Sequence, residues 1–415
     1  MPRMSPAGSK RALSALAGLL LAPASAAAAL EEVVVTATRS PVALERYAGS
    51  ATRVDAQDVG LAGATHVSEL VNRAAGAMIQ RGSGEESLTA LRSPVLTGAG
   101  ACGAVLVLED SIPIRPVGSC NVNELFEVNF EQAAAIEVLR GPASVLYGSS
   151  AVHGIINVIP PRPAQIPALG IGAEYGSDAW RRLRLAVSHE GEERGLGLVM
   201  IGTDDGGWRD ASGFEEQKLN AVLEQGLAGG ELRLTLSGSN LDQETAGFIR
   251  GEDAYRDPAV ARSNPDPEAY RDATSLRLAA HYAAAGGSSL RVFLRSSRMD
   301  FLQHFLLGQP VEDNGQDSGG LMFATAGLNI AGGELVTGVD AELASSTLLQ
   351  SQSGPTTDGP PPANAIRPAG RHYDYAVDTG VLAAWADWRR AIGGRGSLEA
   401  GLRLEHARYD YDNRM

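Results

Sequence analysis

The stretch from Cys102 to Pro161 constrains the fold of this chain more than any other part of the sequence. It contains three apolar runs of four or five residues, rich in Val, Leu and Ile: Ala104–Leu108, Ile136–Leu139 and Ile155–Ile159. Gly, Pro, Asp and Asn punctuate the intervals between the runs. Short apolar runs separated by turn residues are typical of strands in a compact mixed domain. The stretch therefore predicts such a domain.

Two turns separate the later runs. Arg140-Gly141-Pro142 ends the second run, because Gly permits backbone angles closed to other residues and Pro fixes the next one. A second turn follows at Tyr147-Gly148-Ser149-Ser150, and Gly154 opens the third run. The whole order reads IEVLRGPASVLYGSSAVHGIINVI. It strongly resembles the plug domain of TonB-dependent outer-membrane receptors.

In that family a small plug closes a large transmembrane barrel, through which scarce nutrients are taken up with energy from a periplasmic partner, TonB. The resemblance implies an α+β plug domain followed by a transmembrane antiparallel β-barrel. It also implies a plug lock, in which Glu137, Arg140 and Gly141 pair the plug with the barrel wall until the plug is energised. A solvated surface pair is the alternative for Glu137 and Arg140. The expected division of the chain is a signal peptide at 1–29, a TonB box and N-terminal extension at 30–40, the plug at 41–160 and a partial barrel at 161–415.

The N-terminus has the pattern of an export signal. Basic residues at positions 3, 10 and 11 precede the apolar stretch Ala12–Ala22, and the small-residue run Ala24–Ala29 offers cleavage sites. This apolar stretch is too short to cross a bilayer as a stable helix. A disordered Ala-rich tail is the alternative. Further along, no 18 consecutive residues are apolar, so we expect no membrane-spanning helices.

A β-branched run flanked by charges follows the signal directly. Such a run near a free end can join the sheet edge of another protein through its backbone N–H and C=O groups. By resemblance it is the TonB box of the family, and an ordinary first strand of the plug is the alternative. The residues predicted to couple to TonB are Glu32, Val33, Val34, Val35 and Thr36.

Cys102 and Cys120 are the only cysteines. An even count in an exported chain predicts one structural disulfide. A zinc site would need more Cys or His ligands than this region supplies, and a redox role would favour the C-x-x-C spacing that is absent. By resemblance, the loop between the two cysteines lies at the outward-facing apex of the plug. We therefore expect no metal and no cofactor.

Charge and motifs exclude two classes of function. The net charge of −14, with no clustered basic stripe, argues against nucleic-acid binding. The chain carries no G-x-S-x-G, H-E-x-x-H or P-loop motif, so we do not expect an enzyme.

After position 161 the sequence alternates between apolar and polar residues. One face of each expected strand is apolar and the other polar, as in a barrel with lipid outside and water inside, although a soluble sandwich has the same period. The apolar positions are Leu183, Leu185, Val187, Leu232, Leu234, Leu236, Leu276, Leu278, Ala280, Leu290, Val292, Leu294, Leu398, Ala400, Leu402 and Leu404.

The connections distinguish the barrel from the sandwich. Short Gly-containing turns occur at Gly191–Gly195, Gly229-Gly230, Gly286-Gly287, Gly332-Gly333 and Gly393-Gly394. They alternate with long polar stretches at Asp204–Glu215, Gln243–Arg271, Phe301–Gly320 and Leu349–Tyr373. Outer-membrane barrels have this asymmetry. About eleven strands are expected before Met415, whereas plugged transporters have about 22, so we expect about half of the barrel to be missing, by truncation or because the chain is a fragment.

The sequence as a whole predicts a TonB-dependent receptor for a scarce large solute in the outer membrane. By resemblance the solute is a ferric siderophore or cobalamin, and the partners are TonB with its energising complex and outer-membrane lipid. The loops Gln243–Arg271 and Leu349–Tyr373 are expected to share ligand capture, and their aromatics Phe248, Tyr255, Tyr270 and Tyr373 can equally form an interfacial belt. A passive or adhesive barrel without TonB coupling is the alternative.

Overall fold

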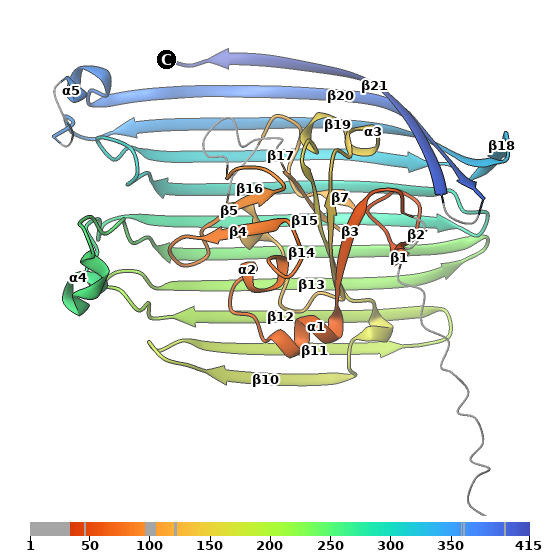
Figure 1. The fold of residues 1–415 in the computed structure, drawn as a ribbon, viewed down its shortest axis with the longest axis horizontal. Coiled ribbons are helices and arrows are strands. Elements are labelled where there is room, and N and C mark those ends of the chain that lie inside the picture. Colours follow the sequence, from red (N-terminus) through yellow and green to blue (C-terminus); the bar gives the residue numbers. More distant parts are fainter. Residues whose placement is uncertain are drawn as a thin grey trace, which may run out of the picture. The chain divides into compact units, whose positions relative to one another are not determined.

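The computed structural model describes residues 34–44, 47–95, 105–119, 123–357, 359, 362–393 and 396–415. Val34–Met415 form one compact unit. Within it, a small α+β part, called the plug, lies against a large antiparallel sheet, called the wall (Figure 1). Within these ranges no helix is both long and apolar enough to cross a membrane.

The plug is built on a five-stranded sheet with the order β3-β8-β9-β6-β7. Its strands β6 and β9 pair in parallel and the other neighbours are antiparallel. The strands predicted from the three apolar runs are present as β6, β8 and β9. The plug elements are β1 (Val34–Val35), β2 (Val42–Ala43), β3 (Ser50–Asp55), α1 (Ala56–Ala62), α2 (Ser68–Val71), β4 (Ala77–Arg81), β5 (Ser87–Leu91), β6 (Val105–Glu109), β7 (Ile112–Pro113), η3 (Glu124–Glu127), β8 (Ala135–Arg140), α3 (Ser144–Tyr147), η4 (Gly148–Ser150) and β9 (Gly154–Ile159).

Both faces of this sheet are covered, which explains why every residue of β8 is buried. On one face Ile136, Val138 and Ile156 pack into the core of the plug with α1 and α2. On the other face Leu139 and Ile155 join a second cluster that includes wall residues. The wall contributes Phe293, Met322, Val336 and Trp385 to that cluster. The plug is therefore attached to the wall by a shared apolar core.

The wall is a twelve-stranded sheet in the described part of the chain. Each strand pairs with its neighbour in sequence, except that the short β18 pairs only with β19. A 3₁₀ turn, η5 (Pro163–Gln165), links the plug to the first strand. The strands are β10 (Leu169–Tyr175), β11 (Arg181–Glu190), β12 (Arg194–Asp205), β13 (Phe214–Leu227), β14 (Gly230–Glu244), β15 (Tyr270–Ala284), β16 (Ser289–Leu302), β17 (Val311–Ala324), β18 (Leu328–Ile330), β19 (Gly333–Gln352), β20 (Gly370–Ile392) and β21 (Gly396–Asn413).

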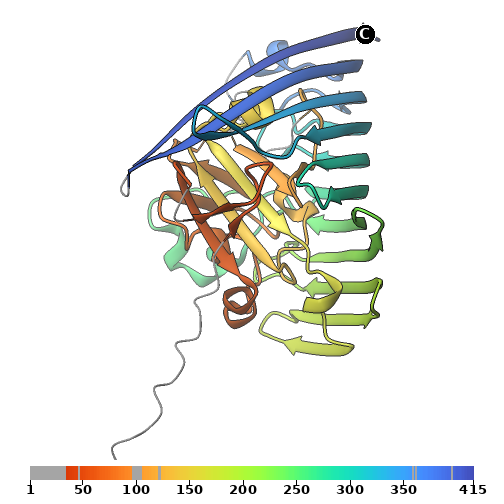
Figure 2. The same ribbon diagram turned by 90° about the vertical axis from the view of Figure 1, so that its right-hand side faces the viewer.

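The two faces of the wall differ as the alternation predicts. The sheet curves around the plug (Figure 2). Polar side chains such as Arg182, Ser237 and Arg277 are buried on the plug side. Large apolar side chains on the opposite face are exposed, including Leu183, Leu276, Leu278, Leu294, Leu402 and Leu404. Contiguous exposed apolar surface of this extent marks an interaction with lipid or protein.

The exposed apolar side chains occupy only part of each strand. On β16 the outward positions Leu290, Val292 and Leu294 are apolar, whereas Arg298 and Asp300 further along the same face are polar. Outward positions of β14 follow the same order, from Leu232–Leu236 to Asn240–Glu244. The apolar band therefore lies toward the short turns, and the polar strand ends lie toward the long connections.

The predicted alternation of connections is present, with one correction. Short turns lie at 191–193, 228–229 and 285–288, and the long connections carry η6 (Ala254–Arg256), α4 (Pro258–Arg262) and α5 (Ala363–Ile366). Figure 1 shows α4 and α5 at one end of the sheet and β18 at the other. The prediction of a long connection at Phe301–Gly320 is wrong. Only residues 303–310 connect strands there, and Val311–Gly320 belongs to β17. That segment is rich in Asp, Asn and Gly, which disfavour strands, but it pairs with β16 on one side and β19 on the other.

Candidate functional site

A large pocket lies between the plug and the long-connection end of the wall. Its volume is about 1930 Å³. From the plug it is lined by the β4–β5 hairpin, including Arg81, Ser83 and Glu86, and by Arg115. The wall and its connections supply most of the remaining surface. The volume exceeds the range of about 300–1,000 Å³ that is usual for small-molecule sites, so the pocket suits a large solute.

Aromatic rings and amides form a prominent part of the pocket lining. Nine aromatic side chains line it: Tyr175, Trp180, Trp208, Phe248, Phe301, Phe305, Tyr373, Tyr375 and Tyr409. Amide side chains lie among them: Gln80, Asn123, Gln303, Asn314, Gln316 and Gln350. Of the four loop aromatics singled out in the sequence, Phe248 and Tyr373 line the pocket. Tyr255 and Tyr270 do not, and the Tyr270 hydroxyl donates to Asp300 Oδ1 at 2.6 Å.

Several charged groups in the pocket lining already have protein partners. Arg115 pairs with Glu124 and Glu127, and Glu86 pairs with Arg271. The Arg209 guanidinium donates to the backbone carbonyl of Ser263. The charges of these groups are therefore partly compensated within the protein, and the rings and amides beside them can stack and hydrogen-bond.

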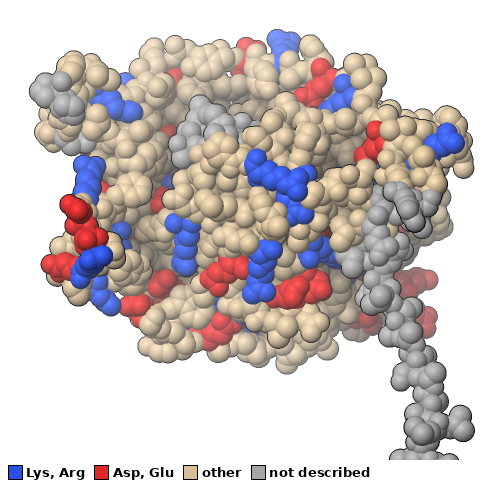
Figure 3. Space-filling view, viewed as in Figure 1, with Lys and Arg blue, Asp and Glu red and all other residues tan. Residues whose placement is uncertain are grey.

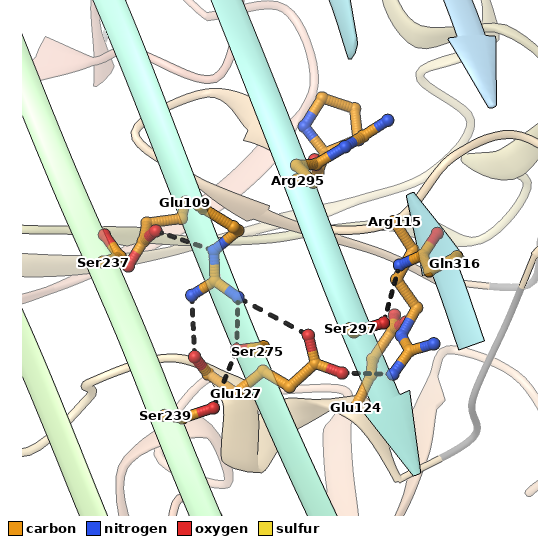
Figure 4. A network of polar contacts seen from close by, with 12 residues as sticks. Glu109, Arg115, Glu124, Glu127, Ser237, Ser239, Ser275, Arg295, Ser297 and Gln316 are labelled. Carbon is orange, nitrogen blue, oxygen red and sulfur yellow. Dashed lines mark hydrogen bonds and ion pairs between the residues drawn. The ribbon is translucent and has the colours of Figure 1, made fainter. Parts of the chain in front are cut away.

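Buried ion pairs join the plug to the wall. One network centres on Arg277 of β15, whose Nε lies 3.0 Å from Glu109 Oε2 and whose Nη2 donates to the Glu127 carbonyl at 2.7 Å. Figure 4 shows Glu109 and Glu127 converging on strands that carry Ser237, Ser239 and Ser275. Other pairs across this interface are Glu86–Arg271, Asp110–Arg233, Glu131–Lys218 and Arg39–Asp340.

Lys218 of β13 is the most buried cation of this interface, with a fully buried side chain. Its Nζ lies 3.2 Å from Glu131 Oε1 of the plug and 2.9 Å from Glu216 Oε2 of the wall. It also lies 4.5 Å from the centroid of the Phe130 ring. Near it, burial, only partly offset by Lys218, raises the pKa of the Glu85 carboxyl to about 7. The wall therefore holds the plug through buried polar contacts as well as through apolar packing.

The N-terminal segment, here residues 34–39, is folded against the plug sheet. Val34 and Val35 pair with β2 as the two-residue strand β1. The Thr36 and Ala37 amides donate to the Glu137 carboxylate, each at 3.0 Å. Arg39 donates to the Leu146 carbonyl and to Asp340 of the wall. Val34, Val35 and Thr36 of the predicted TonB box therefore lie in this N-terminal segment, whereas Glu32 and Val33 lie outside the described residues.

Glu137 of the predicted plug lock binds residues of the plug in place of the expected barrel wall. Besides Thr36 and Ala37, it accepts hydrogen bonds from Arg53 at 2.8 Å and Asn157 at 3.1 Å. The physical reason is that β8 lies inside the plug sheet, between β3 and β9, and the N-terminal segment covers its Glu137 side chain. Glu137 thus binds the N-terminal segment.

Arg140 and Gly141 lie at the end of β8. The Arg140 guanidinium donates to Ser50 Oγ, Thr52 Oγ1 and the Ala75 carbonyl. Arg92 donates to the same Ser50 hydroxyl at 3.0 Å. Burial, followed by the neighbouring Arg92 charge, lowers the pKa of Arg140. Gly141 has a φ of +111°, as a turn of this kind requires. Figure 3, in the same view as Figure 1, shows basic side chains (blue) gathered near the middle of the visible face.

Sequence reasoning missed the plug–wall pairs. Cys102 and Cys120, the predicted disulfide, lie outside the described residues. The wall side of these pairs consists of inward-facing Arg and Lys at polar positions of the alternating strands. The plug side consists of acidic residues such as Glu127 and Glu131. Basic residues at lumen positions were the available signal, but their acidic partners in the plug are 87 to 185 residues away in the sequence.

Comparison with known proteins supports this description of the plug. Residues 43–155 match the family model TonB-dependent Receptor Plug Domain. These residues are a TonB-dependent receptor plug domain. The match ends within β9, and it includes Glu137, Arg140 and Gly141 but not the N-terminal segment.

The plug and wall together have the fold of TonB-dependent receptors. The unliganded ferric citrate transporter FecA superposes with a TM-score of 0.72 at 19% identity, over 89% of this chain and 58% of that chain. The ferric yersiniabactin uptake receptor FyuA from Yersinia pestis gives 0.66 at 19% identity, over 88% and 58%. The ferripyoverdine receptor of Pseudomonas aeruginosa gives 0.72 at 16% identity, over 92% and 55%. This chain thus spans somewhat more than half the length of these receptors.

Proposed function

We propose that the protein is an outer-membrane receptor that captures a scarce large solute and takes it up under the control of TonB. One observation carries the proposal: the segment whose sequence resembles a TonB box is folded against the same plug whose β4–β5 hairpin lines a large pocket. A solute in the pocket and a partner at the segment would thus act on one small domain. The similar solved proteins are transporters and receptors, which supports transport over catalysis.

A ferric siderophore is the proposed solute. The similar structures are described as receptors for ferric citrate, ferric yersiniabactin and ferripyoverdine. The pocket volume of about 1930 Å³ and its ring and amide lining are compatible with such iron chelates. Cobalamin is the other large solute to be tested.

Quenching of tryptophan fluorescence tests capture, because Trp180 and Trp208 line the pocket and Trp388 does not. The purified protein in detergent is titrated with a panel of ferric siderophores and with cobalamin. Saturable quenching by a ferric siderophore, reduced in the Trp180→Phe and Trp208→Phe variants and retained in Trp388→Phe, is expected. Saturation by cobalamin alone would contradict the siderophore proposal.

Deletion of Glu32–Thr36 tests the coupling to TonB. Uptake of the bound solute by cells that produce the variant should be lost, while binding to the cell surface persists. Unchanged uptake would instead favour a passive channel, and surface binding with no uptake in the undeleted protein would favour an adhesive protein. The Cys102–Cys120 disulfide belongs to the same proposal.

A further inference from the structure

The turn between β6 and β7 has an unusual backbone. Glu109 pairs with Ile112 across it, and the two residues between them, Asp110 and Ser111, have φ values of +49° and +67°. Left-handed conformations at two successive residues define a type I′ turn, which favours Asn or Asp followed by Gly. Asp110 fits this preference, whereas Ser111 takes the position where Gly is usual and is strained there. The surroundings of this turn are therefore informative.

Two residues of the turn bind the wall. Glu109 accepts from Arg277 Nε at 3.0 Å and from Asn220 Nδ2 at 3.1 Å. Asp110 accepts from Arg233 Nη2 at 2.6 Å. These partners come from three neighbouring wall strands, β13, β14 and β15. The charges of the wall thus act together with the backbone hydrogen bond from Asp110 N–H to the Val158 carbonyl, at 3.0 Å, to position the first half of the turn.

Ser111, the next residue, binds the N-terminal segment. Its hydroxyl donates to the Thr36 carbonyl at 3.3 Å, and its backbone N–H donates to Asn157 Oδ1 at 2.9 Å. Asn157 Nδ2 then donates to Glu137, the carboxylate that holds the Thr36 and Ala37 amides. Ser111, Asn157 and Glu137 are all fully buried. One turn therefore contacts both the wall and the N-terminal segment through consecutive side chains.

We propose that the turn Glu109–Ile112 couples the wall to the N-terminal segment. The contacts of Glu109 and Asp110 with the wall hold Ser111 in its left-handed conformation, and Ser111 with Asn157 holds Thr36. When the wall contacts loosen, the turn relaxes toward ordinary backbone angles, Ser111 withdraws, and the segment is released from Glu137. The proposal rests on the proposed function only for the use of the released segment, which is binding to TonB.

Hydrogen exchange of the purified protein in detergent tests the coupling without solute or TonB. The test variant is Arg233→Met, which removes the partner of Asp110 and keeps an aliphatic side chain. The matched control is Arg271→Met, since Arg271 pairs with Glu86 of the plug at 3.0 Å and has no contact with the turn. We expect exchange in the peptide covering 34–39 to be at least tenfold faster in Arg233→Met and within twofold of the unmodified protein in Arg271→Met.

A second variant guards against a trivial loss of folding. Ser111→Ala removes the hydroxyl that donates to the Thr36 carbonyl without touching the wall, and it should also accelerate exchange in 34–39. In every variant the β8 peptide must keep its protection, which shows that the plug is folded. An unchanged 34–39 peptide in both Arg233→Met and Ser111→Ala, or equal acceleration in Arg271→Met, would overturn the coupling. Uptake that still requires Glu32–Thr36 would then leave the proposed function standing.

Discussion

Gly154 shows how one residue shapes the plug. It begins β9 with a φ of +147°, a conformation that side chains rarely adopt. A Cβ at this position would lie 2.0 Å from the Leu139 carbonyl oxygen and 2.5 Å from Leu91 Cδ2. The close approach lets β9 pair with β8 from its first residue, so that Asn157 lies opposite Glu137. The polar cluster around the N-terminal segment thus depends on a glycine.

We expect Gly154→Ala to destabilise the plug by about 3 kcal/mol, because both backbone strain and a clash with main-chain atoms must be relieved. Gly60→Ala is the control, since a Cβ there meets nothing within 4 Å in helix α1. Alanine favours helix, so that variant should be neutral or slightly stabilising. The free energy of plug unfolding, from hydrogen exchange of β8 amides, measures both. Equal effects at the two positions would contradict this account.

Two buried groups of the plug give opposite dependences on pH. Burial, reinforced by the charges of Arg81 and Lys218, lowers the pKa of His66 to about 3, so its contribution to stability is lost as pH falls below about 6.5. Burial raises the pKa of Glu85 to about 7, so its contribution is lost as pH rises from about 4.5 toward 7. Between about pH 4.5 and 6.5 the two slopes oppose each other.

In that window we expect the unfolding free energy of the plug to vary little with pH. His66→Asn should leave a stability that falls as pH rises, and Glu85→Gln a stability that rises with pH. Each slope is at most about 1.4 kcal/mol per pH unit. Unfolding at four pH values in detergent provides the measurement. Parallel profiles for the two variants would show that these groups do not titrate as described.

At the scale of elements, the plug and β13 meet at Lys218. This side chain separates Glu131 of the plug from Glu216 on its own strand, and all three are buried. Removing one charge from a buried ion pair leaves the remaining charge uncompensated. This lowers the free energy of unfolding more than replacing the whole pair with apolar residues does. The contact therefore ties the position of the plug to one strand of the wall.

Lys218→Met should weaken the plug by about 3 kcal/mol. The same change at Arg181, whose pair with Asp204 is exposed on the neighbouring part of the wall, should have no measurable effect. The urea concentration at which the β8 amides lose protection compares the two variants. A Lys218→Met protein as stable as Arg181→Met would mean that apolar packing alone seats the plug.

The elements of this fold could be predicted from the sequence far better than their contacts. The runs around Ile136 and Ile155 and the alternation around Leu276 carry local period and turn signals, and each became the expected strand. Val311–Gly320 did not, because its strand conformation comes from two neighbouring strands and not from its own residues. The partners of Glu137 were misassigned for a similar reason. Thr36 lies 101 residues away, and no local pattern encodes that contact.

At the scale of the whole molecule, the wall separates two environments. Its outward face is apolar near the short turns, and its inward face, covered by the plug, carries buried polar side chains beside the apolar cluster that includes Phe293 and Trp385. This arrangement is the one expected of a sheet with lipid on one side and a hydrated lumen on the other. The exposed leucines are thus explained by the proposed outer-membrane location.

Leu294→Arg tests this location. Leu294 is 60% exposed in the apolar band, and an Arg facing hydrocarbon costs about 2–4 kcal/mol at the bilayer midplane. Ser296→Arg, two residues nearer the polar strand end, should cost less. Stability in phospholipid vesicles and in detergent is compared. A penalty of equal size for both variants, or one that persists without lipid, would argue against a bilayer around this band.

The position of the apolar band, toward the short turns, decides where the pocket lies relative to lipid. From Leu294 the strand β16 runs a further eight residues to Leu302, roughly 25 Å at the usual rise per residue, and Ser296, Arg298 and Asp300 on this length face outward. The large pocket between the plug and the wall lies at that end of the strand. On the proposed function, a solute in this pocket would therefore lie beyond the apolar band of β16, where it contacts the side chains of the pocket and not lipid.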